Sequence, residues 1–179
     1  MQRHSEGPVS GRPSKEEYFL RIAEVVLERS TCLLRKYGAV IVVGDTIVST
    51  GYNGPARGMK HCDEFGFCLK ELANMPKGTG YDFCPAVHAE ENAIINAARS
   101  GVSLVGGTLY IAGRDARTGE LTEAMPCERC RRAIINAGIT SVVIRTSDGG
   151  LRRVDPKSWV AEEERRYLEK AGMLRRSRG

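Results

Sequence analysis

The side chains best suited to chemistry are one histidine, one glutamate and two cysteines, which stand in two short motifs. The first motif is His88-Ala89-Glu90, and the second is Pro126-Cys127-Glu128-Arg129-Cys130. One imidazole and two thiolates can supply three protein ligands to a tetrahedral Zn²⁺ and leave the fourth position for water, as in catalytic zinc sites. Glu90 lies two residues from a ligand, where a carboxylate can move the protons of that water. The spacing therefore predicts a hydrolytic centre in which His88, Cys127 and Cys130 hold zinc.

Both motifs are predicted to lie in the first turns of helices. A spacing of three places Cys127 and Cys130 on one helix face, so both sulfurs can reach one ion. His88 and Glu90 are two residues apart and cannot share a helix face, so the site should lie beyond the end of their helix. The positive N-terminal ends of both helices favour thiolates and an anionic intermediate.

A less specific interpretation treats His88 as a core histidine, Glu90 as a surface charge and the two cysteines as a structural pair. A C-x-x-C pair alone also occurs in redox proteins and in structural zinc sites. A redox site, however, calls for a thioredoxin-like βαβ context without the upstream histidine and glutamate. The complete set, with Pro126 in its expected place, favours the catalytic interpretation.

The elements that position these motifs follow from hydrophobic periodicity and turn signals. The capping box Ser14-Lys15-Glu16-Glu17 opens an amphipathic helix to about residue 30, with Tyr18, Ile22, Val25 and Val26 on its inner face. Strands are predicted at 39–43, 46–50, 108–111, 141–144 and 151–154, and further helices at 63–74, 85–100, 127–137 and 155–171. The helix at 85–100 is expected to be buried because it is apolar almost all round. This order predicts an α/β fold, a three-layer α/β/α sandwich with a mixed sheet of about five strands.

Three segments interrupt this pattern. Glycine and proline in Gly51-Tyr52-Asn53-Gly54-Pro55 predict a loop, because together they break either regular structure. Segment 56–84 is largely irregular and contains three of the six cysteines. An irregular stretch of this length inside a compact domain is usually functional or is fixed by another group. A polar loop is predicted from 113 to 124.

Length and composition bound the class of protein. The 179 residues, 41% hydrophobic and 27% charged, predict a flexible N-terminus at 1–14, one domain at 15–172 and a basic C-terminal tail at 173–179. The apolar runs are too short to span a bilayer, and the N-terminus lacks the apolar core of a secretory signal. We therefore expect a cytoplasmic protein whose cysteines are thiols or metal ligands. A net charge of +5 without an aromatic-rich basic stripe favours a small anionic substrate over nucleic acid.

With these motifs in place, the chain resembles the cytidine and deoxycytidylate deaminase superfamily, most closely its deoxycytidylate branch. The resemblance runs from about residue 30 to 145 and rests on Ser30-Thr31-Cys32, Gly38-Ala39-Val40-Ile41-Val42, Gly51-Tyr52-Asn53-Gly54, His88-Ala89-Glu90-Glu91-Asn92-Ala93-Ile94, Gly107-Thr108-Leu109-Tyr110, Pro126-Cys127 with Cys130, and Ile134-Ile135-Asn136-Ala137-Gly138-Ile139. The zinc motif marks the superfamily, and the Gly-Tyr-Asn-Gly segment marks the branch. The resemblance implies a cytidine deaminase-like fold, a homo-oligomer, and zinc-dependent hydrolytic deamination of dCMP to dUMP with release of ammonia.

The resemblance also implies roles for individual residues. Glu90 is the proton donor and acceptor, and Asn53 matches an asparagine that contacts the substrate sugar, although a turn asparagine is the alternative. Three cations near these loops could hold a 5′-phosphate or could be solvated surface charges: Arg35, Arg57 and Lys60. Some members of the branch carry a second, structural zinc, and the four remaining thiols could form a Cys₄ site for it: Cys32, Cys62, Cys68 and Cys84. The alternative is four buried small side chains.

Two features depart from the family pattern, and both are predicted to lie near the pocket. The 113–124 loop is longer than in typical members and carries four charged residues, Arg114, Asp115, Arg117 and Glu120. Arg145 stands where an aromatic residue is common.

Two other functions remain open from the sequence. One is deamination of another nucleoside, nucleotide or RNA base, for which an RNA-acting enzyme should show a more basic surface and salt-dependent binding. The other is an inactive interaction module stabilised by zinc. Glu90 argues against the module, because a purely structural site has no use for that carboxylate.

Overall fold

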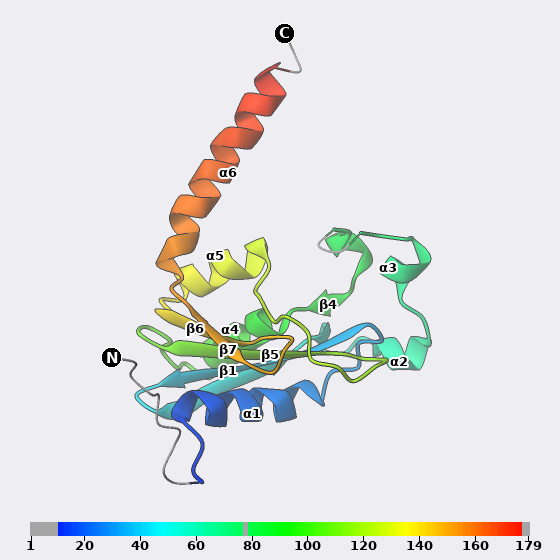
Figure 1. Cartoon of the computed structure of the whole chain (residues 1–179). Helices are drawn as coiled ribbons and strands as arrows, with labels where there is room; N and C mark the ends of the chain where they lie inside the picture. Colours follow the sequence, from blue (N-terminus) through cyan, green and yellow to red (C-terminus); the bar gives the residue numbers. More distant parts are fainter. Residues whose placement is uncertain (1–10, 77–78, 177–179) are drawn as a thin grey trace, which may run out of the picture.

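The computed structural model describes residues 11–76 and 79–176, and it confirms the predicted three-layer α/β/α sandwich (Figure 1). Its central sheet has the strand order β2-β1-β5-β6-β7. The strands are β1 (Arg35–Val43), β2 (Thr46–Tyr52), β5 (Thr108–Asp115), β6 (Ser141–Arg145) and β7 (Leu151–Val154). The sheet is mixed because β5 and β6 pair in parallel, whereas the other neighbouring pairs are antiparallel. A second, two-stranded sheet joins β3 (Gly54–Pro55) to β4 (Ala86–Val87).

Helices cover both faces of the large sheet. They are α1 (Lys15–Leu27), α2 (Cys62–Phe65), α3 (Leu69–Leu72), α4 (Ala89–Arg99), α5 (Glu128–Asn136) and α6 (Lys157–Arg176), with a 3₁₀ turn, η1, at Tyr81–Phe83. Figure 1 shows α1 on one face and α4 and α5 on the other. The single short helix predicted at 63–74 is wrong: α2 and α3 are separate turns, because Gly66 ends α2 in a left-handed conformation at φ 73°.

The buried face of α1 is rotated from the predicted one: Ile22 and Val26 pack half-buried against the core as expected, but the other two predicted residues do not. Tyr18 and Val25 are 51% and 64% exposed, whereas the buried positions are Phe19, Leu20, Ala23 and Leu27. Gly38 on β1 explains this rotation, because a Cβ atom there would lie 2.2 Å from the backbone oxygen of Ala23. The helix therefore approaches the sheet along its Ala23 side, and that approach decides which apolar residues face inward.

The predicted start and burial of α4 were also partly wrong. The helix begins at Ala89, and the two residues expected in its first turn, Ala86 and Val87, form β4 instead. Their partners are Gly54 and Pro55, so part of the predicted glycine-rich loop is paired backbone. The helix is not buried all round, because Ile95 is exposed. Its inner face consists of small side chains, which lets the helix lie close to the sheet.

The described residues include the first and last helices of the predicted domain. The N-cap Ser14 accepts a hydrogen bond from the backbone N–H of Glu17 at 3.1 Å, as the capping box predicts. Helix α6 continues to Arg176, so residues 173–176 of the predicted tail are helical. Residues 1–10 of the predicted N-terminus and 177–179 of the tail lie outside the described residues. None of the helices in the described part is long and apolar enough to cross a membrane.

Arg145 lies on the α1 face of the sheet and does not line the predicted pocket. It is 4% exposed, and its guanidinium donates hydrogen bonds to Glu24 at 2.8 Å and to Glu17 at 2.9 Å. The hydrogen bond from Arg145 lowers the pKa of Glu17 below its ordinary value of 4.5. The departure from the family pattern at this position therefore ties α1 to the sheet and is not part of a substrate site.

We expect Arg145→Met to lower the free energy of unfolding by about 2 kcal/mol, because the charge-assisted hydrogen bonds of a buried guanidinium are lost, although Glu17 and Glu24 keep their ion pairs with Arg21 and Arg114. Urea denaturation at pH 7 measures this change. The contribution of Glu17 is present above pH 4.5 and is lost as the pH falls through its lowered pKa. The variant should therefore lose less stability on acidification than the wild type. Arg153→Met, which removes an exposed ion pair with Glu16, is the control and should change stability by less than about 1 kcal/mol.

Candidate zinc-binding active site

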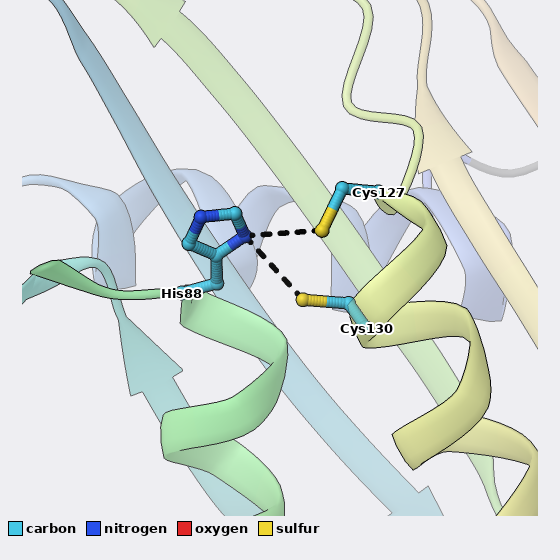
Figure 2. Close-up of side chains that lie close together, drawn as sticks. All are labelled: His88, Cys127 and Cys130. Atoms are coloured by element: carbon cyan, nitrogen blue, oxygen red, sulfur yellow. Dashed lines mark hydrogen bonds between the residues drawn. The ribbon is translucent and has the colours of Figure 1, made fainter. Parts of the chain in front are cut away.

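The three predicted zinc ligands converge at the N-terminal ends of two helices. His88 and Cys127 are the N-cap residues of α4 and α5, one position before the first turns in which they were predicted. Cys130 lies in the first turn of α5 and is fully buried. Figure 2 shows the His88 ring facing both sulfur atoms. Its Nδ1 atom lies 3.5 Å from Sγ of Cys127 and 3.4 Å from Sγ of Cys130.

The geometry of this cluster fits a single zinc ion. Zn–N and Zn–S bonds in a tetrahedral site imply a nitrogen-to-sulfur separation of about 3.6 Å, close to both distances across this cluster. All three ligand atoms lie within 4.8 Å of one another. Within the described residues, this is the one group of three or more histidine, cysteine, aspartate or glutamate side chains that meets that limit. Residues 11–76 and 79–176 therefore contain one preformed metal-ligand set.

The electrostatics of the cluster also favour a cation. A hydrogen bond with the Cys130 thiol, supported by another with His88, lowers the pKa of Cys127 to about 3. The same sulfur-to-sulfur hydrogen bond, together with burial, raises the pKa of Cys130. The hydrogen bond with Cys127 raises the pKa of His88. One thiolate is thus already favoured in a largely buried site, and a divalent cation would stabilise the second.

Glu90 lies beside the metal-ligand set with its side chain almost completely buried. It is 7% exposed and follows His88 by two residues at the start of α4. Burial raises the pKa of its carboxyl group, although the nearby His88 acts in the opposite direction. A buried carboxyl with a raised pKa can both accept and return a proton near neutral pH. The acid–base role of Glu90 stays a prediction, for which this position is suitable.

A cavity of about 250 Å³ lies next to the metal-ligand set and Glu90. Its lining joins His88, Glu90 and Cys127 to side chains from distant segments: Arg35, Tyr37, Asn53, Lys70, Tyr81 and Met125 are among them. The Tyr81 ring centroid lies 5.8 Å from that of His88, and Lys70 Nζ lies 5.5 Å from the Tyr81 centroid. Neither Lys70 nor Tyr81 was predicted from the sequence. Their only signal was their place in the irregular 56–84 segment, which ends at the zinc motif.

Of the predicted substrate contacts, the structure brings two into this cavity and leaves two outside it. Asn53 and Arg35 line the cavity. Arg57 donates a hydrogen bond to Asn96 at 2.8 Å and lines a different hollow, and the exposed Lys60 is not part of the lining. The predicted role of Arg57 and Lys60 in phosphate binding therefore has no support from their positions.

Asn53 is held more firmly than a turn asparagine. Its Oδ1 accepts hydrogen bonds from Ser30 Oγ and from the backbone N–H of Tyr37, both at 2.7 Å. Its Nδ2 donates to the backbone oxygen of Arg35 at 2.9 Å. These bonds fix the loop before β1 against the end of β2. Asn53 therefore shapes the wall of the cavity whether or not it also touches a ligand.

The other four cysteines lie in one region but do not form a compact ligand set. Three of them, Cys32, Cys68 and Cys84, line the active-site cavity. Burial, followed by the negative charges of those three thiols, raises the pKa of Cys62 to about 11. All four are free and half-buried, so they are not simply core residues. In the part of the chain that the structure describes, they do not come within the 4.8 Å limit that the His88 cluster meets.

The 113–124 segment does not form the open charged loop expected beside the pocket. It folds back on itself through a bridge between Arg114 and Leu121. Arg114 donates to Glu24 of α1 at 2.9 Å, and Arg117 donates to Glu71 of α3 at 2.5 and 2.7 Å. Ala124 is the residue of this segment that lines the cavity. The charged residues of the loop therefore join structural elements and do not contact the predicted substrate position.

A three-layer α/β domain with one histidine, two cysteines and a buried glutamate at two helix N-termini defines the zinc-dependent class of deaminases. Comparison with known proteins agrees. Residues 13–146 match the family model described as the cytidine and deoxycytidylate deaminase zinc-binding region. The chain therefore belongs to the cytidine and deoxycytidylate deaminase family.

Individual relatives give the same family. A deoxycytidylate deaminase from Mycobacterium phage D29 is 36% identical over 137 residues, which are 74% of this chain and 94% of that protein. The Schizosaccharomyces pombe deoxycytidylate deaminase is 36% identical over 136 residues, which cover 76% of this chain but only 38% of that protein. The chain thus spans well under half of the yeast protein. A crystal structure of dCMP deaminase from cyanophage S-TIM5 in complex with dCMP and dUMP is 26% identical, has a TM-score of 0.55, and covers 76% of this chain and 85% of its own.

Proposed function

We propose that this protein hydrolytically deaminates dCMP to dUMP and releases ammonia. The observation that carries the proposal is the buried Glu90 beside the His88, Cys127 and Cys130 cluster, all at one cavity. Relatives at 36% identity named deoxycytidylate deaminase, and a related structure described as a complex with dCMP and dUMP, support the substrate. Cys127 and Cys130 from α5 and His88 from α4 would hold the zinc ion.

In this reaction the zinc ion would activate water and Glu90 would transfer the protons. A bound zinc ion supplies Lewis acidity, which makes a water molecule more acidic and more nucleophilic at neutral pH. Glu90 accepts a proton from the attacking water and gives a proton to the ring nitrogen next to the reacting carbon. Once the water oxygen has bonded to that carbon, Glu90 takes the remaining proton of the new hydroxyl group and gives it to the departing amine, so the C–N bond breaks, the carbonyl forms and ammonia leaves. Because Glu90 is buried, bulk water does not compete for these protons.

Two cations at the cavity suit a nucleotide monophosphate. Arg35 and Lys70 both line the cavity, and Lys70 Nζ lies 5.5 Å from the centroid of the Tyr81 ring. Paired cations bind a phosphate dianion more strongly than a neutral sugar. We therefore assign the 5′-phosphate to Arg35 and Lys70, and the sugar to the wall that Asn53 shapes.

A substrate panel tests the proposal. Zinc-loaded protein is incubated separately with dCMP, CMP, deoxycytidine, dCTP and single-stranded RNA, and ammonia release is measured. We expect the highest kcat/KM for dCMP. Turnover of another compound without turnover of dCMP would overturn the substrate assignment. Turnover of RNA alone would favour deamination of an RNA base. No turnover of any compound by zinc-loaded protein would support the inactive module.

We also propose that Cys32, Cys62, Cys68 and Cys84 hold a second, structural zinc. The charge interactions of Cys62 with the other three thiols support this, because they place the four sulfurs in one region. Such an ion would fix α2, α3 and η1, which have no fully buried side chains of their own.

We expect two zinc ions per purified chain by elemental analysis, and one per chain in the Cys62→Ser, Cys84→Ser double variant. Loss of the second ion should also make segment 56–84 more sensitive to protease, because the ion replaces a hydrophobic core there. One zinc per wild-type chain, with all four thiols freely alkylated, would contradict this prediction.

The setting of the reaction is also a proposal. All six cysteines are free thiols, which supports a cytoplasmic location. Exposed apolar side chains on α2, α3 and α6 support a homo-oligomer.

A further inference from the structure

Helix α6 carries a surface that the catalytic domain does not use. The helix has 20 residues and lies beyond residues 13–146, which match the family model. Its first half packs on the domain through the buried Trp159 and through ion pairs of Glu162 and Glu163 with Arg131 and Arg132. Figure 1 shows the second half projecting away from the sheet. In the described part of the chain, no side-chain hydrogen bond or ion pair joins residues 167–176 to the domain.

One face of the helix between residues 164 and 175 is apolar at its centre and charged at its ends. Glu164, Leu168, Ala171 and Arg175 follow the spacing i, i+4, i+7 and i+11, so they lie along one side of the helix. Tyr167 and Leu168 are 75% and 69% exposed at the centre of this face. Glu164 and Arg175 are both exposed, and among the described residues neither has an ion-pair partner. We call these five residues the α6 face.

We propose that the α6 face pairs antiparallel with the α6 face of a second copy of this chain. With the two helices antiparallel, Leu168 of each copy can lie opposite Ala171 of the partner subunit. In the same register Glu164 lies opposite Arg175 of the partner subunit, and two-fold symmetry makes each contact occur twice. Tyr167 then covers the small Ala171 and Gly172 positions, where the helix backbones can approach closely.

The charges of the α6 face favour a second copy of the chain as the partner and an antiparallel arrangement of the two helices. In a parallel pair, Glu164 would face Glu164 of the partner subunit, and Arg175 would face another arginine. The antiparallel pair replaces both repulsions by attractions and also opposes the two helix dipoles. A polyanion would meet Glu164 and Glu169 on this half of the helix, so its attraction to the basic end is partly cancelled. The contact is short, so taken alone it should be weak and concentration-dependent, in roughly the micromolar range.

A charge-exchange experiment tests the pairing. Glu164→Lys and Arg175→Glu are made separately, and self-association is measured by sedimentation velocity over a range of protein concentrations. Each variant alone brings like charges together at both ends of the contact, so we expect its dissociation constant to rise at least about tenfold. An equimolar mixture of the two variants restores two opposite-charge pairs, so its dissociation constant should return to within about threefold of the wild-type value. Single variants that associate like the wild type, or a mixture that stays dissociated, would overturn the pairing.

A chemical cross-link tests the register even if the catalytic domains associate through other surfaces. Arg175→Lys keeps the charge and introduces an amine that a carbodiimide can couple to Glu164. These positions are too far apart within one helix to react with each other, so the cross-link must join two copies. Mixing ¹⁴N- and ¹⁵N-labelled protein should give a cross-linked peptide of mixed isotope composition. Absence of this peptide would contradict the register. Turnover per chain should be unchanged in all these variants, since the α6 face does not line the active-site cavity.

Discussion

The Glu90→Gln protein is expected to keep its zinc and to lose at least about a hundredfold in kcat for deamination, because a well-placed acid–base group contributes about 10² to 10⁴-fold. The amide fills the same space in the buried site but cannot take a proton from water. The three metal ligands are untouched, so elemental analysis should give the wild-type zinc content. Steady-state measurement of ammonia release with dCMP gives the change in rate.

Glu91→Gln is the matched control, because it makes the same chemical change one residue further along α4. Glu91 forms an ion pair with Arg129 at 2.6 Å and accepts a 3.4 Å hydrogen bond from the backbone N–H of His88. Loss of the Glu91 carboxylate weakens a surface ion pair and a helix cap, so we expect kcat to decrease by less than about tenfold. A Glu90→Gln protein that keeps a tenth of the wild-type rate would remove Glu90 from the proton-transfer role.

The metal-ligand set could be predicted from the sequence because it is built from local structure. His88 and Cys127 are N-caps, and Cys130 lies three residues beyond Cys127, so the helix starts alone aim the ligands at one point. The metal-ligand set also depends on one long-range contact, because α4 and α5 must lie side by side on one face of the sheet. The alternation of helices and strands predicted the three-layer sandwich, which the structure confirms, but it did not predict which helices share a layer.

The walls of the cavity could not be predicted, because they depend on contacts between segments with no regular pattern. Tyr81 and Lys70 reach the cavity from a segment of isolated turns, where periodicity gives no direction for a side chain. Arg145 lies in a regular strand, yet the face of the sheet on which its side chain lies was not predicted. It was predicted just after a strand that ended at residue 144, but it is the last residue of β6, and the face on which its side chain lies depends on strand alternation counted to a single residue.

The Gly-Tyr-Asn-Gly segment has a more structural role than the family resemblance implied. Asn92 of α4 donates to the backbone oxygen of Tyr52 at 2.8 Å, and Asn96 donates to that of Thr50 at 2.8 Å. Ser49 donates to the backbone oxygen of Ala93 at 2.6 Å. Strand β2 and helix α4 are thus joined by hydrogen bonds along their length. This close packing places His88 and Glu90 relative to the sheet.

Gly51 stands at the centre of this contact, and Gly51→Ala should have the largest effect on stability of any conservative change in the segment. A Cβ atom there would lie 2.3 Å from the backbone nitrogen of Ala93 and 2.4 Å from the backbone oxygen of Ala89. The clash is with helix backbone and not with a flexible side chain, so α4 itself must move. We expect a loss of about 3 kcal/mol in the free energy of unfolding, measured by urea denaturation. Because α4 carries His88 and Glu90, the variant should also bind zinc more weakly and lose activity.

Gly54→Ala is the matched control in the same segment. The nearest atom to a Cβ there is a Tyr52 side-chain carbon at 3.9 Å, which is an ordinary van der Waals distance. Its free energy of unfolding should therefore stay within about 1 kcal/mol of the wild type. If Gly51→Ala were as stable as Gly54→Ala, the close approach of α4 to β2 would not be what fixes the active site. If Gly51→Ala were destabilised but kept full zinc affinity, α4 would have moved without displacing His88, and the site would owe its geometry to α5 and the small β3–β4 sheet instead.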